Sequence, residues 1–319
     1  MRIDRNRVLQ RFKEYTDAYD ASDEKIALKI RHTYRVAGLC EQIARSEKRS
    51  EEEQSLAWLL GMLHDVGRFE QLRRYDTFSD ADSVDHAQLG ADILFAGNKS
   101  GAISAADIGC GHNGALATDA GCGHNGALAA DAGCGHNGAF TADIGCGRNA
   151  VLAADAGEGG MIREWIEDAS EDALIETAVR VHSAYRVPEG LDERTELFCH
   201  ILRDADKIDI LRVNIETPLE EIYNTTKEAL YHAEVSNAVM ESFYERHATL
   251  RSIKRTPVDH IAGHVSLIYE LVFPESFRIV QEQGYWKKLI GFPSENPKTV
   301  GQLQALCEAM EKFLAEKER

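Results

Sequence analysis

The chain has 319 residues and a formal net charge of −17 at neutral pH. Hydrophobic residues make up 44% of it, which is enough for a sizeable core in one large domain or two smaller ones. So negative a charge argues against a nucleic acid polymer as partner, because such binding depends on Lys and Arg neutralising phosphates. A small phosphorylated molecule is not excluded, since local cations can reverse the field inside one cleft.

Neither a run of about 18 apolar residues nor an apolar N-terminal leader is present in the sequence. Residues 1–20 are charged throughout, so we expect a cytoplasmic protein that does not enter a membrane. Cys40, Cys199 and Cys307 lie in amphipathic helical patterns, where Cys is usually a small core residue. The pattern does not indicate the disulfide framework of a secreted protein.

Outside the middle of the chain, apolar residues recur with a period near 3.6, and we therefore predict an all-α fold. One apolar helix face extends from Ile26 to Ile43. Ser50 and Glu53 form a capping-box pattern that opens the next helix, which we expect to end near Gly67. Further helices are expected over 84–96, 161–187 and 192–213. The remaining residues alternate helical segments with breaks at Pro218, Pro257, Pro274, Pro293 and Pro297.

The middle of the chain is a tandem repeat, in which a twelve-residue unit rich in Gly, Ala and Asp recurs. Two successive units read ADIGCGHNGALA (106–117) and TDAGCGHNGALA (118–129). The composition favours a low-complexity loop produced by duplication. Two alternatives are a stacked repeat with an inner ladder of Ala and Leu, and a metal site built from the Cys-Gly-His triplets.

The repeat separates two segments that would otherwise form one helical hairpin, so we interpret it as an insertion at a loop tip. The chain then divides into three parts. We expect a helical core from residues 1–97 together with 160–215, an insertion over 98–159, and a C-terminal helical part over 216–319 packed on the core.

The most informative residues are His64 and Asp65, in the run Leu-His-Asp-Val-Gly-Arg at the end of an apolar helix. Adjacent His and Asp side chains reach one metal ion only where a helix end presents both, and the other ligands must come from other helices. His32 upstream and Asp204 downstream, in the run Arg-Asp-Ala-Asp-Lys, stand where such helices would supply them. Imidazole nitrogens with carboxylate oxygens suit the divalent ions Mn²⁺, Fe²⁺, Co²⁺, Ni²⁺, Mg²⁺ and Zn²⁺.

These residues, together with the segments HDVGRFEQ, TFSDADSVDHAQLGADILF and ILRDADKIDIL, resemble the HD-domain superfamily of metal-dependent phosphohydrolases. The resemblance covers most of residues 20–215 apart from the repeat, and it implies a bundle of five or more helices. It also implies a set of metal ligands, namely His32, His64, Asp65 and Asp204. Asp204 is preferred to the alternative, Asp206, because the first Asp after Leu-Arg fits the family position.

Two further histidines, His86 and His182, stand where two-metal members of the superfamily carry extra ligands. Such members often have two adjacent His at the later position, whereas His182 is followed here by Ser183, so a second metal is left open. For His86, the alternatives are a helix cap or a support for another ligand, a second-metal ligand, and a direct phosphate contact. In the catalytic interpretation both histidines line the phosphate side, and Asp65 orients the attacking water while it ligates the metal.

The resemblance implies hydrolysis of a phosphomonoester or phosphodiester, and we expect a small substrate such as a nucleotide. Arg68, close after the His-Asp doublet, and Lys207, three residues after Asp204, are the candidate phosphate contacts. One alternative is a metal-dependent nucleotide sensor or regulatory module with little turnover; another makes the repeat an interaction segment. The intact ligand set favours the enzyme. The sequence carries no signal for substrate identity or oligomeric state.

Overall fold

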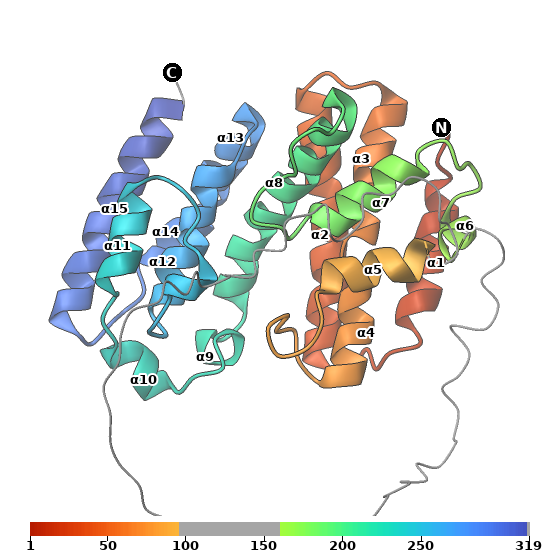
Figure 1. Ribbon diagram of the computed structural model, residues 1–319. Coiled ribbons are helices and arrows are strands. Elements are labelled where there is room, and N and C mark those ends of the chain that lie inside the picture. Colours follow the sequence, from red (N-terminus) through yellow and green to blue (C-terminus); the bar gives the residue numbers. More distant parts are fainter. Residues whose placement is uncertain (96–159, 318–319) are drawn as a thin grey trace, which may run out of the picture.

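A computed structural model of the protein describes residues 1–95 and 160–317. Within these two ranges the chain forms helices and no strand, which confirms the predicted all-α fold. Figure 1 shows two groups of helices side by side, with a long helix, α8, running between them. The repeat at 98–159, with its three interpretations, lies outside the described residues.

The N-terminal half contains the helices that precede Thr217. They are α1 (Arg5–Thr16), α2 (Glu24–Ser46), α3 (Glu51–Leu63), α4 (Val66–Tyr75), α5 (His86–Phe95), α6 (Ile162–Trp165), α7 (Asp172–Val181) and α8 (Glu193–Glu216). The C-terminal half contains α9 (Leu219–Ile222), α10 (Lys227–His232), α11 (Asn237–Tyr244), η1 (Arg251–Ile253), α12 (Asp259–Val265), η2 (Ser266–Glu270), α13 (Pro274–Gln283), α14 (Tyr285–Ile290) and α15 (Pro297–Lys317).

Local sequence signals account for several helix ends. The capping box at Ser50 is present, with the Ser50 hydroxyl accepting from the Glu53 backbone and the Glu53 carboxylate accepting from the Ser50 backbone. Pro274 and Pro297 each occupy the first helical position, where a missing N–H costs nothing, so they begin helices as well as ending the preceding loops.

The helix that carries the His-Asp doublet ends earlier than we predicted. α3 ends at Leu63, and α4 begins at Val66. Asp65 leaves the helical path, with φ −106° and ψ 14°, so that the chain turns between the two helices. The doublet therefore lies at a corner, and two adjacent side chains can face the same interior space.

Glycine sets the spacing of the helices around this corner. A Cβ on Gly61 of α3 would lie 2.4 Å from Cα of Ala37 on α2, and a Cβ on Gly67 of α4 would lie 2.1 Å from the carbonyl oxygen of His86 at the start of α5. Contacts as short as these leave no room for a side chain, because real Cβ atoms do not approach backbone so closely. The glycines thus let α2 and α5 approach the doublet.

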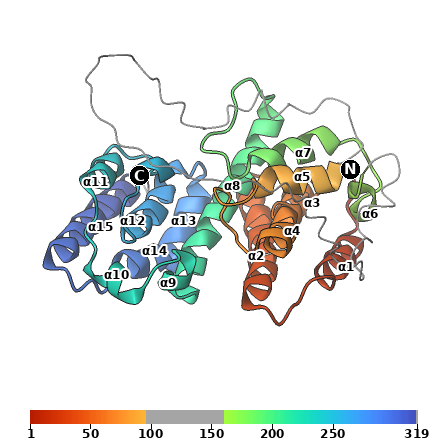
Figure 2. The ribbon, with the colours of Figure 1, turned by 60° about the horizontal axis from the view of Figure 1, so that its bottom comes forward.

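α8 is the central helix of the molecule. It packs against α2, α3 and α7 in the N-terminal half and against α12, α13 and α14 in the C-terminal half. The view in Figure 2, turned by 60°, also shows it between the two halves. Its N-terminus is capped by Asp192, whose side chain accepts from the backbone of Arg194 and Thr195.

The two segments that flank the repeat meet at one place. Gly160 has φ +69°, a conformation that L side chains rarely adopt, and a Cβ there would lie 2.5 Å from the carbonyl oxygen of Leu94 near the end of α5. The chain therefore leaves and re-enters the helical core at neighbouring points. Among the described residues, no helix is long and apolar enough to cross a membrane.

The close approach of α2 and α3 gives a first prediction. Gly61→Ala should lower the free energy of unfolding by about 1–3 kcal/mol, because the added methyl forces the two helix backbones apart. Chemical denaturation measures this directly. Gly38→Ala is the matched control: it lies in α2 with nothing within 4 Å of the added Cβ, and it should stabilise the helix by up to about 1 kcal/mol. Equal effects of the two substitutions would contradict the packing argument.

Candidate metal centre

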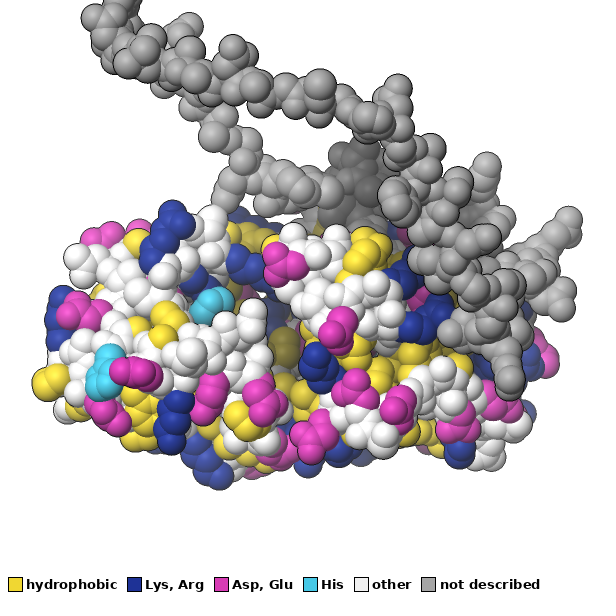
Figure 3. All heavy atoms as spheres, turned by 90° about the horizontal axis from the view of Figure 1, so that it is seen from below, with side chains coloured by type: hydrophobic (Ala, Val, Ile, Leu, Met, Phe, Trp, Pro, Cys, Tyr) yellow, Lys and Arg dark blue, Asp and Glu magenta, His cyan; other side chains and the backbone are white. Residues whose placement is uncertain are grey.

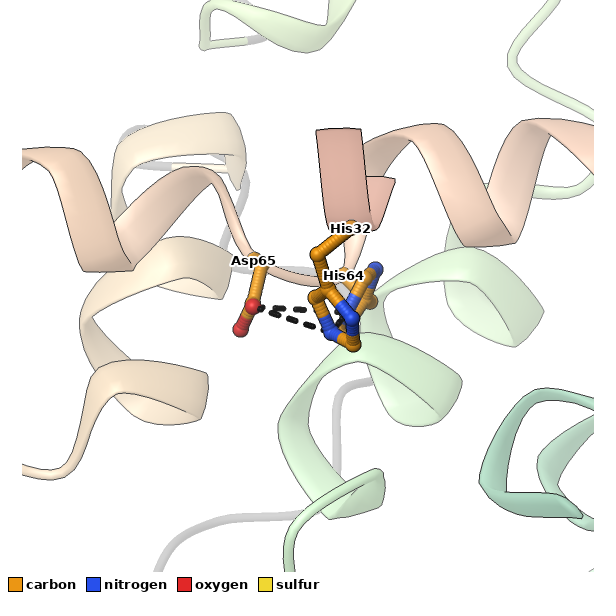
Figure 4. Close-up of side chains that lie close together, drawn as sticks. All are labelled: His32, His64 and Asp65. Atoms are coloured by element: carbon orange, nitrogen blue, oxygen red, sulfur yellow. Dashed lines mark hydrogen bonds and ion pairs between the residues drawn. The ribbon is translucent and has the colours of Figure 1, made fainter. Parts of the chain in front are cut away.

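Four buried histidines from four helices converge on one interior space. His32 comes from α2, His64 from the end of α3, His86 from the start of α5 and His182 from the end of α7. Nε2 of His32 lies 3.3 Å from Nε2 of His64, and Nε2 of His86 lies 3.0 Å from Nε2 of His182. Figure 4 shows the first of these pairs beside Asp65. The structure thus brings together the histidines that the sequence singled out.

Two of the rings are oriented by the carbonyl three residues earlier in the chain. Nδ1 of His64 lies 2.8 Å from the carbonyl oxygen of Gly61, and Nδ1 of His182 lies 2.7 Å from that of Val179. Because a carbonyl oxygen only accepts, Nδ1 carries the hydrogen in both rings. The lone pair of each neutral ring is therefore on Nε2, which faces the shared space.

The other two rings are oriented by carboxylates. Nδ1 of His32 donates to Asp209 Oδ2 at 2.7 Å, and Nδ1 of His86 lies 3.0 Å from both oxygens of Asp80. Burial raises the pKa of Asp209, but its bonds to Arg212 and His32 outweigh this and leave the pKa lowered. A carboxylate that fixes the ring and its tautomer is the usual support of a metal-binding histidine.

Asp65 lies between the two pairs of imidazoles. Its Oδ2 is 3.6 Å from His32 Nε2 and 3.5 Å from His64 Nε2. Its Oδ1 is 3.5 Å from His86 Nε2 and 3.8 Å from His182 Nε2. The described residues thus contain two groups of three donors, each with its atoms within 4.8 Å of one another, and Asp65 belongs to both. This arrangement suits one ion in each group with a shared carboxylate.

The structure does not place Asp204, the ligand preferred from the sequence, against the histidines. Asp204 Oδ2 accepts from the backbone N–H groups of Val272 and Phe273, at 2.9 and 3.1 Å, and thereby joins α8 to the segment before α13. Asp206 Oδ1 instead lies 3.1 Å from His32 Nε2. Residues two apart on a helix point about 200° away from each other, so only one of the two can face the histidines. The structure places the alternative, Asp206, there.

Lys29 is a site residue that the sequence did not single out. Its ammonium lies 2.7 Å from Asp65 Oδ2, one helical turn before His32 on α2. The pKa of Asp65 would be raised by burial, but Lys29 and then His64 hold it well below its usual value. The carboxylate is therefore ionised and able to bind a cation.

Arg68 supports the centre from the α4 side. Its Nη1 donates to Gln71, to the carbonyl of Phe78 and to Asp80, the carboxylate that orients His86. Its Nε is buried without a hydrogen-bond partner and lies 3.8 Å from Asp65 Oδ1. Nη1 of Arg68 thus binds the loop before α5, while its Nε faces the proposed metal ligand Asp65.

Lys207 lies beside Asp206 on α8 and is half buried. Within the two described ranges its side chain makes no hydrogen bond or ion pair with another residue. Burial, and then the nearby Arg203, lower the pKa of Lys207 to about 8. A cation without a partner at this position is well suited to meet an anionic ligand.

The donor set fits a divalent transition metal. Imidazole nitrogen and carboxylate oxygen together are the ligands that Mn²⁺, Fe²⁺, Co²⁺, Ni²⁺ and Zn²⁺ take in proteins. The rings must be neutral to bind, and burial together with Arg68 lowers the pKa of His86 to about 3. For His32, burial and Lys29 favour the neutral form, but bonds to Asp206 and Asp209 raise its pKa overall. A metal would compete with a proton at that Nε2.

Comparison with protein families identifies one domain. The family model of the HD domain matches residues 30–120, a range that includes His32, His64, Asp65 and His86. Comparison with curated proteins and comparison with solved structures give no match.

The choice between the two α8 carboxylates gives a second prediction. Asp206→Asn should weaken Mn²⁺ binding by at least as much as Asp209→Asn, which should weaken it by about 10–100-fold because it loosens the His32 ring. Asp204→Asn should leave Mn²⁺ affinity unchanged and lower stability instead. Calorimetric titration of the folded variants with Mn²⁺ measures all three. A loss of affinity in Asp204→Asn alone would restore the sequence-based assignment.

Proposed function

Because the chain contains an HD domain, we propose that the protein is a metal-dependent phosphohydrolase. The observation that carries the proposal is the shared carboxylate, Asp65, between two pairs of buried imidazoles whose Nε2 atoms face one another. When bound, a divalent metal supplies Lewis-acid polarisation of a phosphate oxygen and makes water more acidic. His86 and His182 are proposed to hold a second ion on the phosphate side.

The residues around the donors suit a phosphate ester. The half-buried ammonium of Lys29 lies 2.7 Å from a proposed metal ligand, Asp65, and the half-buried Lys207 follows another, Asp206, directly on α8. Both would meet the oxygens of a phosphate bound at the ions, and Arg68 would add its Nε edge. We propose that these cations bind and orient the ester, while Asp65 orients the attacking water.

We further propose that the substrate is small, with a nucleotide as the first class to test. The donors are buried, and the carboxylates Asp65, Asp80 and Asp206 carry negative charge around them, which a bound divalent ion offsets. A compact phosphorylated molecule gains from the metal and the lysines at once. A nucleic acid polymer would also meet the acidic surface of a chain with net charge −17.

Hydrolysis gives the third prediction. The protein loaded with Mn²⁺ should release phosphate or a nucleotide product from at least one member of a panel of nucleotides and phosphate esters. Asp65→Asn should lower kcat by a hundredfold or more, about 3 kcal/mol, because both ions lose their shared charge. Asp17→Asn, at the exposed C-terminal cap of α1, is the matched control and should retain full activity.

The result that would contradict the proposal is equally direct. Tight Mn²⁺ binding without turnover on any substrate, together with nucleotide binding, would identify a sensor or regulatory module in place of an enzyme. Turnover that survives Asp65→Asn would place the chemistry outside this centre.

Lys207 gives the fourth prediction. Lys207→Met should raise the KM for the phosphate ester by about tenfold and leave kcat largely unchanged, because the ammonium binds ground state and transition state alike. Lys207→Arg should restore part of the affinity, since it keeps the charge. Steady-state kinetics of both variants, with the exposed Lys312→Met as control, measures the split. A fall in kcat with constant KM would assign Lys207 a different role.

A further inference from the structure

A second group of basic side chains lies in the C-terminal half, apart from the metal ligands. His260 and His264 are one turn apart on α12, and the ring of Tyr223 stacks against both, with centroids 5.0 and 5.5 Å away. The side chain of Lys254 lies along the same helix, where a Cβ on Gly263 would be 2.4 Å from its Nζ. All four side chains are half buried. We call Lys254, His260, His264 and the neighbouring Arg251 the α12 basic cluster.

A chain of hydrogen bonds from α8 orients one member of the α12 basic cluster. Asn214 donates through Nδ2 to the carbonyl of Ile210, so its Oδ1 is left to accept from the Tyr223 hydroxyl at 3.0 Å. Because the Tyr223 hydroxyl donates its only proton to Asn214, it must accept the hydrogen bond from Nδ1 of His264, also at 3.0 Å. Nε2 of His264 is therefore the free position of the ring, and no described residue forms a hydrogen bond to it.

Within the described parts of the chain, Lys254, His260 and His264 form no ion pair, while the exposed Arg251 lies 4.0 Å from Asp80 Oδ2. Asp259 is the nearest acid in sequence, but its carboxylate already accepts from the Ser236 backbone and hydroxyl and from the backbones of Arg255 and Thr256. The Lys254 ammonium makes no hydrogen bond or ion pair with another described residue. A half-buried ammonium without a partner, such as that of Lys254, is well placed to bind an anion from outside the chain.

Three members of the α12 basic cluster have lowered pKa values, as expected for basic groups packed together without an anion. Burial, and then Arg251, lower the pKa of Lys254 to about 8. Burial, and then Lys254, lower the pKa of His260 to about 4 and that of His264 well below its usual value. A bound anion would raise the pKa of each of these groups.

The α12 basic cluster lies close to the metal centre. Arg251 Nη1 is 4.0 Å from Asp80 Oδ2, and Asp80 is the carboxylate that orients His86. The hydroxyl of Tyr185, just after His182, donates to the carbonyl of Ala248 at 3.1 Å and joins the two halves at the same place. Figure 3 shows a hollow between the halves, with Lys or Arg and His side chains at its margin. One ligand can therefore reach both sets of side chains.

We propose that the α12 basic cluster binds a second phosphate group of the substrate whose ester is hydrolysed at the metal centre. The two cations, Lys254 and Arg251, match the double charge of a phosphate, whereas the single charge of a carboxylate would not. The substrate class is then a small molecule with two separated phosphates. This inference rests on the proposed hydrolase function.

A binding experiment tests the α12 basic cluster without catalysis. Inorganic phosphate is titrated calorimetrically into the full-length protein in the presence of a chelator, so that no metal contributes. The parent protein and Asp65→Asn should bind, and Lys254→Met should bind at least about tenfold more weakly, equivalent to 1.4 kcal/mol. Gly263→Ala should also weaken binding, since its methyl displaces the Lys254 ammonium without removing the charge. Lys312→Met is the matched control and should bind like the parent.

A kinetic experiment tests whether the bound anion belongs to the substrate. Adenosine 3′,5′-bisphosphate and adenosine 5′-monophosphate are compared as probes with the Mn²⁺-loaded protein. The parent should prefer the bisphosphate, and Lys254→Met and Gly263→Ala should each reduce the ratio of the two kcat/KM values by about tenfold.

The outcomes separate the two proposals. Absence of phosphate binding under chelation, or binding that is indifferent to both Lys254→Met and Gly263→Ala, overturns the second phosphate site. An equal ratio of kcat/KM values in parent and variants also overturns it. Hydrolysis of neither probe nor any other ester, with phosphate binding intact and dependent on Lys254, overturns the hydrolase function and with it the claim that the anion is part of a substrate.

Discussion

The hydrogen bond between His32 and Asp209 is the interaction on which the centre depends most. It joins α2 to α8 across 177 residues of sequence, and it fixes which nitrogen of His32 faces the other imidazoles. Arg212 holds Asp209 in turn, through two bonds of 2.7 and 2.8 Å. If the ring turned over, the first group of donors would lose its Nε2, and the contact of Asp206 would be lost with it. The precision of the site thus comes from helix packing and not from the doublet alone.

α8 contacts three different parts of the molecule, each with a different face of the helix. Asp206 and Asp209 face the histidines, Asp204 binds the backbone before α13, and Asn214 reaches Tyr223 and the α12 basic cluster. A helix can do this because its side chains rotate by about 100° per residue. The metal centre and the C-terminal half are therefore held by one rigid helix, and a displacement of α8 would change the geometry of both.

Positively charged side chains lie close to acidic ones in this protein, although its net charge is strongly negative. The whole chain carries a net charge of −17, yet Lys29, Lys207 and Lys254 are all half buried. Low exposure makes each of these charges act more strongly than a surface lysine would. Such a field would draw a small anion inwards while the outer surface repels larger ones.

The all-α fold was readable from the helical periodicity of the sequence, and the resemblance to the HD-domain superfamily singled out His32, His64, Asp65, His86 and His182, which the structure brings together. The choice between Asp204 and Asp206 was not readable, since the two differ only in helix face, and that depends on how α8 is rotated against its neighbours.

The sequence also did not predict the residues that orient the proposed ligands from distant segments. Nothing in the local sequence distinguishes Asp80 and Asp209 from other acidic residues. Only the fold brings Asp209 to Nδ1 of His32 and Asp80 to Nδ1 of His86. Lys29 has the spacing of one helical turn from His32, which was the only available signal.

The meeting of Gly160 with Leu94 has a consequence for how this chain can change in length. Leu94 and Gly160, the described residues on either side of the repeat, lie together at the end of α5 opposite to His86. Repeat units gained or lost there alter the chain by twelve residues at a time without shifting the register of any helix that carries a metal ligand. The number of repeat units can therefore change while the spacing of the proposed metal ligands within their helices stays the same, and we expect an added domain to be tolerated at this junction.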